Sequence, residues 1–314
     1  MKRLMALTLT LIMTALMASG CAGEKKAAVR VGSLSGPTTI GIANMMNDNK
    51  DSYEFTMATQ PDEIASKIGA GDLDIALIPA NLAASLYNKT NGGIRIIDIN
   101  TLGVLYCVTG DTSITGINDL SGKTVITTGQ GATPEYAVNY LLDQYNVENV
   151  TLDFKADGQE VIAALSQDKD QIAILPQPAA TAATVKIEGV NTAFSLNDTW
   201  SDLNNGSMFI TGVTVARKEF IEQNKEAVDR FIEDHKISAD KASSDLDTTA
   251  AKTVELGIIA KEPVAKKAIP LCNIVCMSGN GIKAPLEGYL TTLFNANPKS
   301  IGGAMPGEDF YYEG

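Results

Sequence analysis

One histidine, His235, and four cysteines are the side chains best suited to nucleophilic or metal chemistry, and they are scattered along the 314-residue chain. A nucleophile needs a general base beside it, and a zinc site needs three or four convergent ligands. Neither pattern occurs in the sequence. His235 falls at the edge of the buried stripe of a predicted helix, where we expect it to pack. The sequence therefore predicts no catalytic residue, no metal and no cofactor.

The charge balance excludes another class of protein. The chain has 37 acidic and 25 basic residues, a formal charge of −12, and no basic run. Nucleic-acid binding depends on clustered lysine and arginine that displace counterions from phosphates. We therefore expect no nucleic-acid partner. With 45% hydrophobic residues, the chain has the composition of a globular protein.

The amino terminus has the features of an export leader. Lys2 and Arg3 precede an apolar run from Leu4 to Ala18, which is shorter than the roughly 20 residues of a spanning helix. The small residues that follow end at Cys21 and resemble a bacterial lipobox, with Ala18 at the usual leucine position. We expect residues 1–20 to be a signal peptide, Cys21 to carry lipid and residues 21–28 to be a tether. The alternative is a secreted chain in which Cys21 is incidental.

Three cysteines remain beyond the leader, and an odd number cannot pair fully within one chain. Cys272 and Cys276 are close enough in sequence to form a bridge outside the cell. They are equally well explained as two small apolar residues in a buried strand. The sequence leaves the choice open.

Two glycine-containing turns are the strongest candidates for a binding site. Each follows a predicted strand and opens a helix, so that backbone N–H groups and threonine hydroxyls are available to an anionic or acceptor-rich ligand. The alternative is that they are well-formed strand-to-helix turns and nothing more. The candidate residues are Ser35, Gly36, Pro37, Thr38 and Thr39 in the first turn and Gly131, Ala132 and Thr133 in the second.

A second group of candidates lies at strand ends and at the expected passages between lobes. Asn81 and Gln177 each follow a buried strand, where an amide can donate and accept hydrogen bonds. Tyr106 and Met208 could contact an apolar or aromatic ligand or could pack at a hinge. Trp200 is expected to anchor a polar loop.

The elements that would position these residues occur twice in the same order. Each copy runs strand, helix, strand, helix, strand, which is typical of parallel α/β units. The first copy has strands at 29–34, 53–57 and 75–79 and helices at 40–46 and 62–70; the second has strands at 124–128, 150–154 and 172–176 and helices at 136–142 and 159–167.

Two such units predict two α/β lobes. We expect residues 29–107 to form the first part of lobe 1, residues 108–208 to form lobe 2, and residues 209–314 to return to lobe 1 with C-terminal helices. Ligands of open α/β sheets bind beyond the carboxyl ends of the strands. Both candidate turns would then face one cleft between the lobes.

Several motifs resemble those of solute-binding proteins of ABC importers, in the branch that handles thiamine-pyrimidine precursors, sulfonates and nitrate-like solutes. The resemblance covers essentially the whole mature chain, and its most specific element is the D-L-x-G-K run at 119–123. It implies the type II periplasmic-binding fold, with two lobes joined by two crossovers. The supporting segments are the lipobox, Gly36-Pro37-Thr38, Gly71-Asp72-Leu73-Asp74-Ile75-Ala76, Asn118 to Val125 and Ala227-Val228-Asp229-Arg230-Phe231.

The resemblance implies a monomeric, lipid-anchored extracytoplasmic protein that delivers a small solute to a permease and an ATP-binding subunit. No arginine stands in the four candidate segments, which favours a mono-anionic or neutral ring compound. The main alternative is an enzyme on the same fold, such as a lyase of the chorismate-dehydratase type, although those enzymes have no export leader. A sensor module that feeds a signalling partner is a third alternative.

Overall fold

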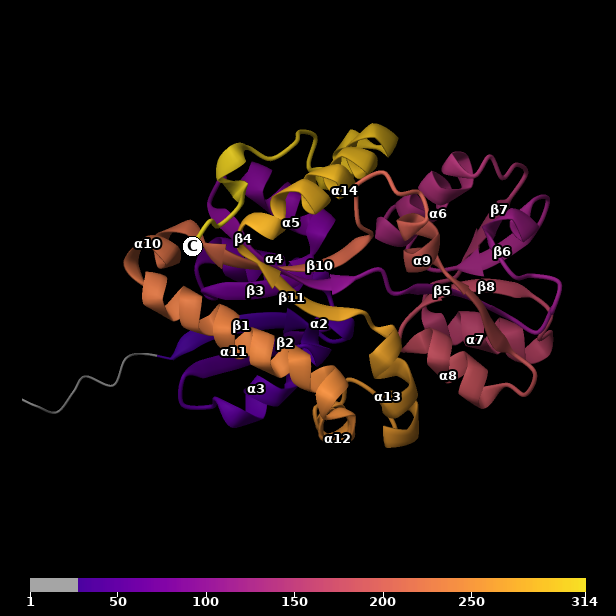
Figure 1. Ribbon diagram of the computed structural model, residues 1–314, viewed down its shortest axis with the longest axis horizontal. Helices are drawn as coiled ribbons and strands as arrows, with labels where there is room; N and C mark the ends of the chain where they lie inside the picture. Colours follow the sequence, from indigo (N-terminus) through magenta and orange to yellow (C-terminus); the bar gives the residue numbers. More distant parts are fainter. Residues whose placement is uncertain (1–27) are drawn as a thin grey trace, which may run out of the picture.

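The computed structural model describes residues 28–314, which form two α/β lobes side by side (Figure 1). The expected signal peptide, Cys21 and all but the last residue of the expected tether lie outside the described residues. Within residues 28–314, no helix is both long enough and apolar enough to span a bilayer.

Lobe 1 is built on a six-stranded sheet with the order β11-β4-β10-β3-β1-β2. Strands β1, β2 and β3 are mutually parallel, whereas β10 runs antiparallel to both β3 and β4, and β11 runs antiparallel to β4. The strands are β1 (Val29–Leu34), β2 (Tyr53–Ala58), β3 (Ile75–Pro79), β4 (Ile94–Leu102), β10 (Ile210–Arg217) and β11 (Ile274–Ser278).

Lobe 2 is built on a five-stranded sheet with the order β7-β6-β8-β5-β9. Strand β6 pairs in parallel with β7 and β8, and β5 runs antiparallel to β8 and β9. The strands are β5 (Leu105–Thr109), β6 (Thr124–Thr127), β7 (Thr151–Phe154), β8 (Ile172–Pro176) and β9 (Asn191–Ser195).

The two sheets repeat one strand order, in which β2-β1-β3-β10 corresponds to β7-β6-β8-β5. In each sheet the antiparallel fourth strand comes from the segment that has just crossed from the other lobe. The two-lobed α/β fold expected from the repeat is confirmed, with sheets that are mixed because of these returning strands. Cys107 lies within β5, so the first passage between the sheets precedes it, between Leu102 and Leu105.

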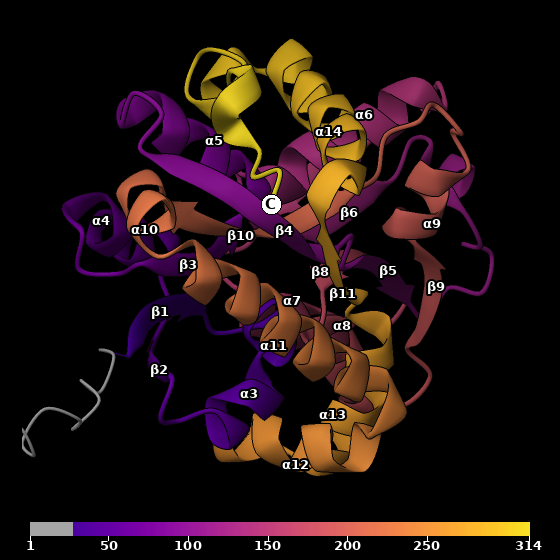
Figure 2. The same cartoon turned by 60° about the vertical axis from the view of Figure 1, so that its left-hand side comes forward.

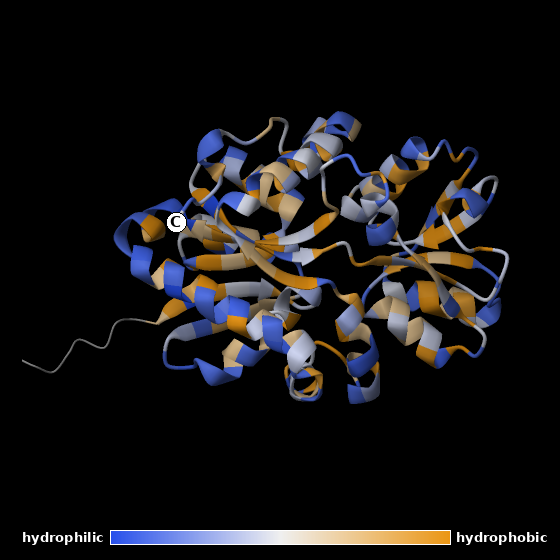
Figure 3. Cartoon of the chain, viewed as in Figure 1, coloured by the Kyte–Doolittle hydropathy of each residue, from blue (hydrophilic) through white to orange (hydrophobic). Residues whose placement is uncertain are grey.

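Helices cover both faces of each sheet, and their outer faces are hydrophilic while the strands between them are apolar (Figures 1 and 3). The α-helices are α2 (Pro37–Ile40), α3 (Ala43–Asp48), α4 (Pro61–Ala70), α5 (Ala80–Lys89), α6 (Thr133–Gln144), α7 (Gly158–Gln167), α8 (Ala179–Lys186), α9 (Leu196–Ser201), α10 (Lys218–Gln223), α11 (Lys225–Ser244), α12 (Leu246–Glu255), α13 (Glu262–Ala268) and α14 (Lys283–Ala296). Short 3₁₀ turns are η1 (Ile117–Leu120), η2 (Ile269–Leu271), η3 (Gly279–Gly281), η4 (Pro298–Ile301) and η5 (Glu308–Phe310).

Local sequence explains most of these elements. Helix α4 begins with Pro61 in its first turn, buries Ile64 and Ile68 four residues apart, and ends at Gly71 in the left-handed conformation. The single helix expected over 40–46 is instead two short helices, α2 and α3, with a break at Gly41. A Cβ atom at Gly41 would lie 3.2 Å from Ile274 Cγ2 and 3.3 Å from His235 Nε2, so the chain packs closely here against the C-terminal half.

C-terminal helices of lobe 1 also contact lobe 2. Helix α14 packs against α6, and α13 packs against α8, on opposite sides of the passage between lobes (Figures 1 and 2). The two passages themselves touch, because a Cβ atom at Gly103 would lie only 2.4 Å from Phe209 Cδ1. The lobes are therefore joined by two adjacent crossovers and braced by two helices.

Candidate binding site between the lobes

The first candidate turn is shaped by Gly36 and by hydroxyl groups that bond within lobe 1. Gly36 has φ 145° and ψ −155°, a conformation essentially restricted to glycine. Thr38 Oγ1 donates to the Leu34 carbonyl at 3.0 Å, and Thr39 Oγ1 lies 2.8 Å from Ser33 Oγ. Both threonines are buried, whereas Ser35 is exposed. The outer part of the turn, not its threonine hydroxyls, is therefore free to meet a solute.

The second candidate turn carries its own carboxylate. Gly131 has φ 71°, and its N–H donates to Glu135 Oε2 at 2.5 Å. The carboxylate therefore already satisfies part of the positive end of α6. Ala132 and Thr133 are half-buried. This turn is less suited to a strongly anionic group than the sequence alone indicates.

The two candidate walls meet in the structure. Thr133 Oγ1, at the start of α6 in lobe 2, donates to Asn81 Oδ1, on α5 of lobe 1, at 3.1 Å. Nearby, Asn297 Nδ2 of lobe 1 donates to the Tyr136 hydroxyl of lobe 2 at 3.1 Å. Residues that the sequence placed in separate units thus face one another between the lobes.

Gln177 lies at the carboxyl end of β8 and is 1% exposed. Its Oε1 accepts from the Thr181 hydroxyl at 2.8 Å, and its backbone N–H donates to the Val104 carbonyl at 2.9 Å. Its Nε2 has no hydrogen-bond partner among the described residues. An unpartnered buried amide is costly, so this N–H₂ group is a donor suited to an acceptor atom of a ligand.

Tyr106 and Met208 differ in their accessibility. Tyr106 is 5% exposed and its hydroxyl donates to the Leu271 carbonyl at 2.8 Å, which ties β5 to lobe 1. Burial raises the pKa of Tyr106 to about 12. Met208 is 37% exposed, two residues before β10 begins. Tyr106 therefore has the position of a hinge residue, and Met208 remains accessible.

The structure also contains an aromatic cluster that the sequence analysis did not predict. Trp200 was expected to anchor a loop, but it lies in α9, is fully buried, and donates to Ser207 Oγ at 2.9 Å. Its ring centroid lies 4.5 Å from that of Tyr140, 5.3 Å from Phe209 and 5.7 Å from Tyr289. These rings come from both lobes. Tyr140 and Tyr289 are distant in sequence from Trp200 and Phe209, so no local pattern predicts the cluster.

Tyr289, on α14, brings a second buried polar atom to this region. Its side chain is fully buried, its hydroxyl lies beside Thr133, and that hydroxyl forms no well-oriented hydrogen bond with a described residue. Burial raises the pKa of Tyr289, which keeps the hydroxyl protonated at neutral pH. Together with Gln177, it supplies a potential donor near the edge of lobe 2.

Charged side chains gather elsewhere on lobe 1. Asp74 pairs with Arg30 at 2.6 Å and with Arg217 at 2.9 Å, and Arg95 pairs with Asp309 at 2.5 Å. Surface hollows of about 460 and 400 Å³ adjoin Arg95 and Arg217, respectively, and no candidate site residue lines either one.

The single histidine has a buried acidic partner. His235 Nδ1 lies 3.0 Å from Asp98 Oδ2, both side chains are fully buried, and Cys276 is adjacent. His235 is thus packed in the core as expected, but with a polar contact that the helix pattern did not predict. Cys107, Cys272 and Cys276 are free thiols, so the possible bridge between the last two is not formed.

Comparisons with known proteins identify related families and folds. The family model described as NMT1/THI5 like matches residues 91–247. No curated protein matches the chain. A solved ABC transporter protein from Parabacteroides distasonis is 23% identical with a TM-score of 0.79, covering 91% of this chain and 99% of that one.

Two sulfonate-binding proteins have similar structures. The periplasmic aliphatic sulphonate-binding protein SsuA of Escherichia coli is 14% identical with a TM-score of 0.69, covering 91% of this chain and 94% of its own. The alkanesulfonate-binding protein SsuA of Xanthomonas axonopodis pv. citri, bound to MOPS, is 8% identical with a TM-score of 0.67. The match covers 93% of this chain and 100% of that one. At these identities the likeness shows a shared fold.

Proposed function

Because the chain belongs to the NMT1/THI5-like family, we propose that it is the solute-binding subunit of an ABC importer, which captures a small solute between its lobes. The observation that supports this proposal is the contact across the lobes between Thr133, in the candidate turn of lobe 2, and Asn81, which follows β3 in lobe 1. Closure of two lobes around a solute would give a permease and its ATP-binding subunit a signal of occupancy.

The solute we propose is neutral or mono-anionic, contains a ring and is rich in acceptor atoms. Gln177 Nε2 is buried without a partner, the Tyr289 hydroxyl is buried beside Thr133, and both groups can donate. The candidate residues include no charged side chain, and Glu135 already occupies the N-terminal turn of α6. These features favour a hydrogen-bonding ring over a multiply charged anion.

Thermal unfolding with a panel of compounds tests the proposal. The panel contains pyrimidines, aromatic carboxylates, alkanesulfonates, MOPS and nitrate. Nitrate represents small inorganic anions. A bound solute at a hundred times its Kd adds about 2.7 kcal/mol to the free energy of unfolding and raises the Tm. Gln177→Leu is expected to weaken binding at least about tenfold, the cost of one lost buried hydrogen bond.

The matched control is Gln171→Leu, because Gln171 precedes β8 at the end of the strand away from Gln177. It is expected to leave affinity unchanged. Equal binding by wild type and Gln177→Leu would remove Gln177 from the site. Conversion of a panel compound to product, followed by mass spectrometry, would favour the lyase alternative over a binding protein.

We further propose that the protein is a monomer and that lipid on Cys21 anchors it to the outer face of the cell membrane. The leader-like segment and its small residues before Cys21 support this. Cys21→Ser is expected to move the protein from the membrane fraction to the soluble extracytoplasmic fraction. Retention of the variant in the membrane fraction would contradict lipid attachment at this residue.

A further inference from the structure

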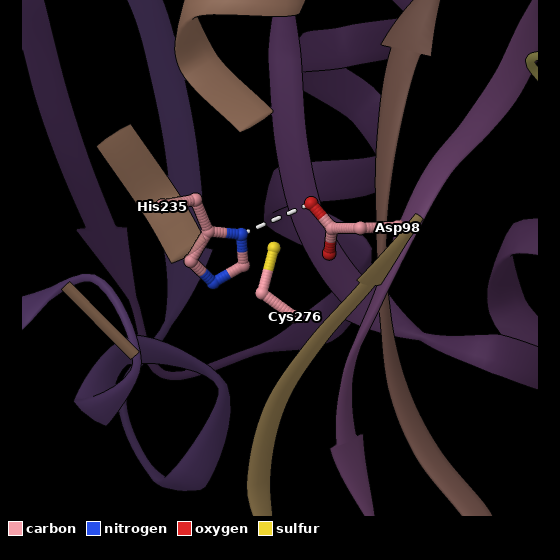
Figure 4. Close-up of side chains that lie close together, drawn as sticks. All are labelled: Asp98, His235 and Cys276. Carbon is pink, nitrogen blue, oxygen red and sulfur yellow. Dashed lines mark hydrogen bonds and ion pairs between the residues drawn. The ribbon is translucent and has the colours of Figure 1, made fainter. Parts of the chain in front are cut away.

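Three potential metal ligands from distant parts of the chain meet inside lobe 1. Asp98 comes from β4, His235 from α11 and Cys276 from β11 (Figure 4). One ligand atom from each residue lies within 4.8 Å of the other two, and His235 Nδ1 is 3.0 Å from Asp98 Oδ2. In Figure 4 the sulfur lies beside the edge of the imidazole that carries Nδ1.

A backbone irregularity brings Cys276 to this group. Strand β11 pairs with β4 at Ile274 with Thr101 and at Met277 with Ile99, so three steps on β11 oppose two on β4. Such a bulge contains one extra residue and redirects nearby side chains. Cys276 lies within this segment, next to Asp98 of the neighbouring strand.

Asp98 is held in position by hydrogen bonds behind it. Its Oδ1 accepts from the Thr214 hydroxyl at 2.6 Å, and Thr214 Oγ1 accepts in turn from Asn100 Nδ2 at 3.2 Å. This leaves Oδ2 directed at His235. Bonds of this kind orient the ligands of metal sites and are part of their affinity.

The thiol is poorly suited to act as a free nucleophile. Burial, and then the neighbouring charge of Asp98, raise the pKa of Cys276, so its neutral form dominates at physiological pH. A nucleophilic triad would also need the thiol at the Nε2 side, whereas Nε2 faces Gly41.

We propose that Asp98, His235 and Cys276 form a binding site for one Zn²⁺ ion. A thiolate and a carboxylate would together neutralise the dication, the neutral imidazole would complete three protein ligands, and a solvent molecule would take the fourth position. Zn–N and Zn–O bonds are about 2 Å and a Zn–S bond is about 2.3 Å, so the three ligand atoms, which lie within 4.8 Å of one another, would draw together around the ion. Cys276 is partly buried, whereas the side chains of Asp98 and His235 are fully buried.

The ion would fasten α11 and β11 to β4, joining the returning part of the chain to the first part of lobe 1. Binding to the folded state alone stabilises it. His235 Nε2 faces Gly41, two residues after the first candidate turn, so zinc binding and solute binding are measured separately, each in the absence of the other ligand.

The test uses the purified protein, freed of metal by a chelator and titrated with Co²⁺ and Zn²⁺. We expect one equivalent of Co²⁺ to bind and to produce a near-ultraviolet thiolate-to-cobalt charge-transfer band, which Zn²⁺ then removes. One equivalent of Zn²⁺ should also raise the Tm. Cys276→Ser and His235→Gln should each lose the band and weaken Zn²⁺ binding by about 10- to 100-fold or more.

Cys107→Ser is the matched control, because Cys107 is another free buried thiol and lies in β5 of lobe 2. It should retain the band and the affinity. The absence of stoichiometric binding in wild type would overturn the proposal, as would binding without a thiolate band. Persistence of the band in Cys276→Ser, a conservative change at a partly buried residue, would overturn it too.

Discussion

Asp74 connects three strands of lobe 1 through two arginines. Its carboxylate accepts from the Arg30 side chain and backbone and from Arg217 NH2 at 2.9 Å, and its side chain is 8% exposed. Asp74→Asn leaves two cations without their buried partner, and we expect a loss of about 3 kcal/mol in the free energy of unfolding. Urea unfolding at pH 7 measures this loss.

The same carboxylate predicts a pH dependence. Burial would raise the pKa of Asp74, but the hydrogen bonds from Arg30 and Arg217 outweigh it and the pKa is lowered. The stabilisation is therefore fully present above the unfolded pKa of about 4 and is lost as the pH falls through the folded value. The difference between wild type and Asp74→Asn should shrink on acidification; a constant difference would contradict the assignment. Glu188→Gln, at an exposed carboxylate, should show no such difference.

The two crossovers form one packed unit, although they are about a hundred residues apart in sequence. A Cβ atom at Gly103 would lie 2.4 Å from Phe209 Cδ1, and Phe209 is itself fixed by the Trp200 ring. Gly103→Ala should destabilise the protein by about 1–3 kcal/mol through overpacking, a Tm lower by several degrees. Differential scanning calorimetry measures the shift.

A double-mutant cycle isolates this contact. Phe209→Leu combined with Gly103→Ala should recover part of the loss, because the smaller side chain makes room for the methyl group. Gly116→Ala is the control, since no atom lies within 4 Å of a Cβ atom there and its backbone is extended. Equal effects of Gly103→Ala and Gly116→Ala would show that the crossovers do not pack as described.

Elements governed by neighbouring residues were predictable, and those governed by distant ones were not. Strand, turn and helix in each repeat follow from apolar periodicity and from glycine and proline at fixed places. The close packing of Gly41 against His235 depends on a residue far away in the sequence, and so does the contact of Trp200 with Tyr289 of α14. The Asp98 pairing of His235 likewise needs the sheet order, because no local pattern links β4 with α11.

At the scale of the whole molecule, two side-chain hydrogen bonds join the lobes. A solute that binds between the lobes must either replace these hydrogen bonds or bind beside them. Thr133 donates to Asn81, and Asn297 donates to Tyr136, each at 3.1 Å. At about 1 kcal/mol for each neutral hydrogen bond, losing both shifts the equilibrium between closed and open lobes about thirtyfold toward open. The double variant Thr133→Val with Asn297→Ala should therefore have the larger radius of gyration by small-angle X-ray scattering.

We expect the lobes to open only when a contact between them is lost, and not whenever a hydroxyl group is removed. Ser121→Ala removes a hydroxyl that bonds to the Glu148 carbonyl inside lobe 2, so it should leave the radius of gyration unchanged. Tyr136→Phe removes one interlobe partner while keeping the ring, and should give an intermediate value. An unchanged radius in the double variant would mean that the other interlobe contacts, including those of α13 and α14, are enough to hold the lobes together. Solute capture would then depend on motion of these helices against α8 and α6.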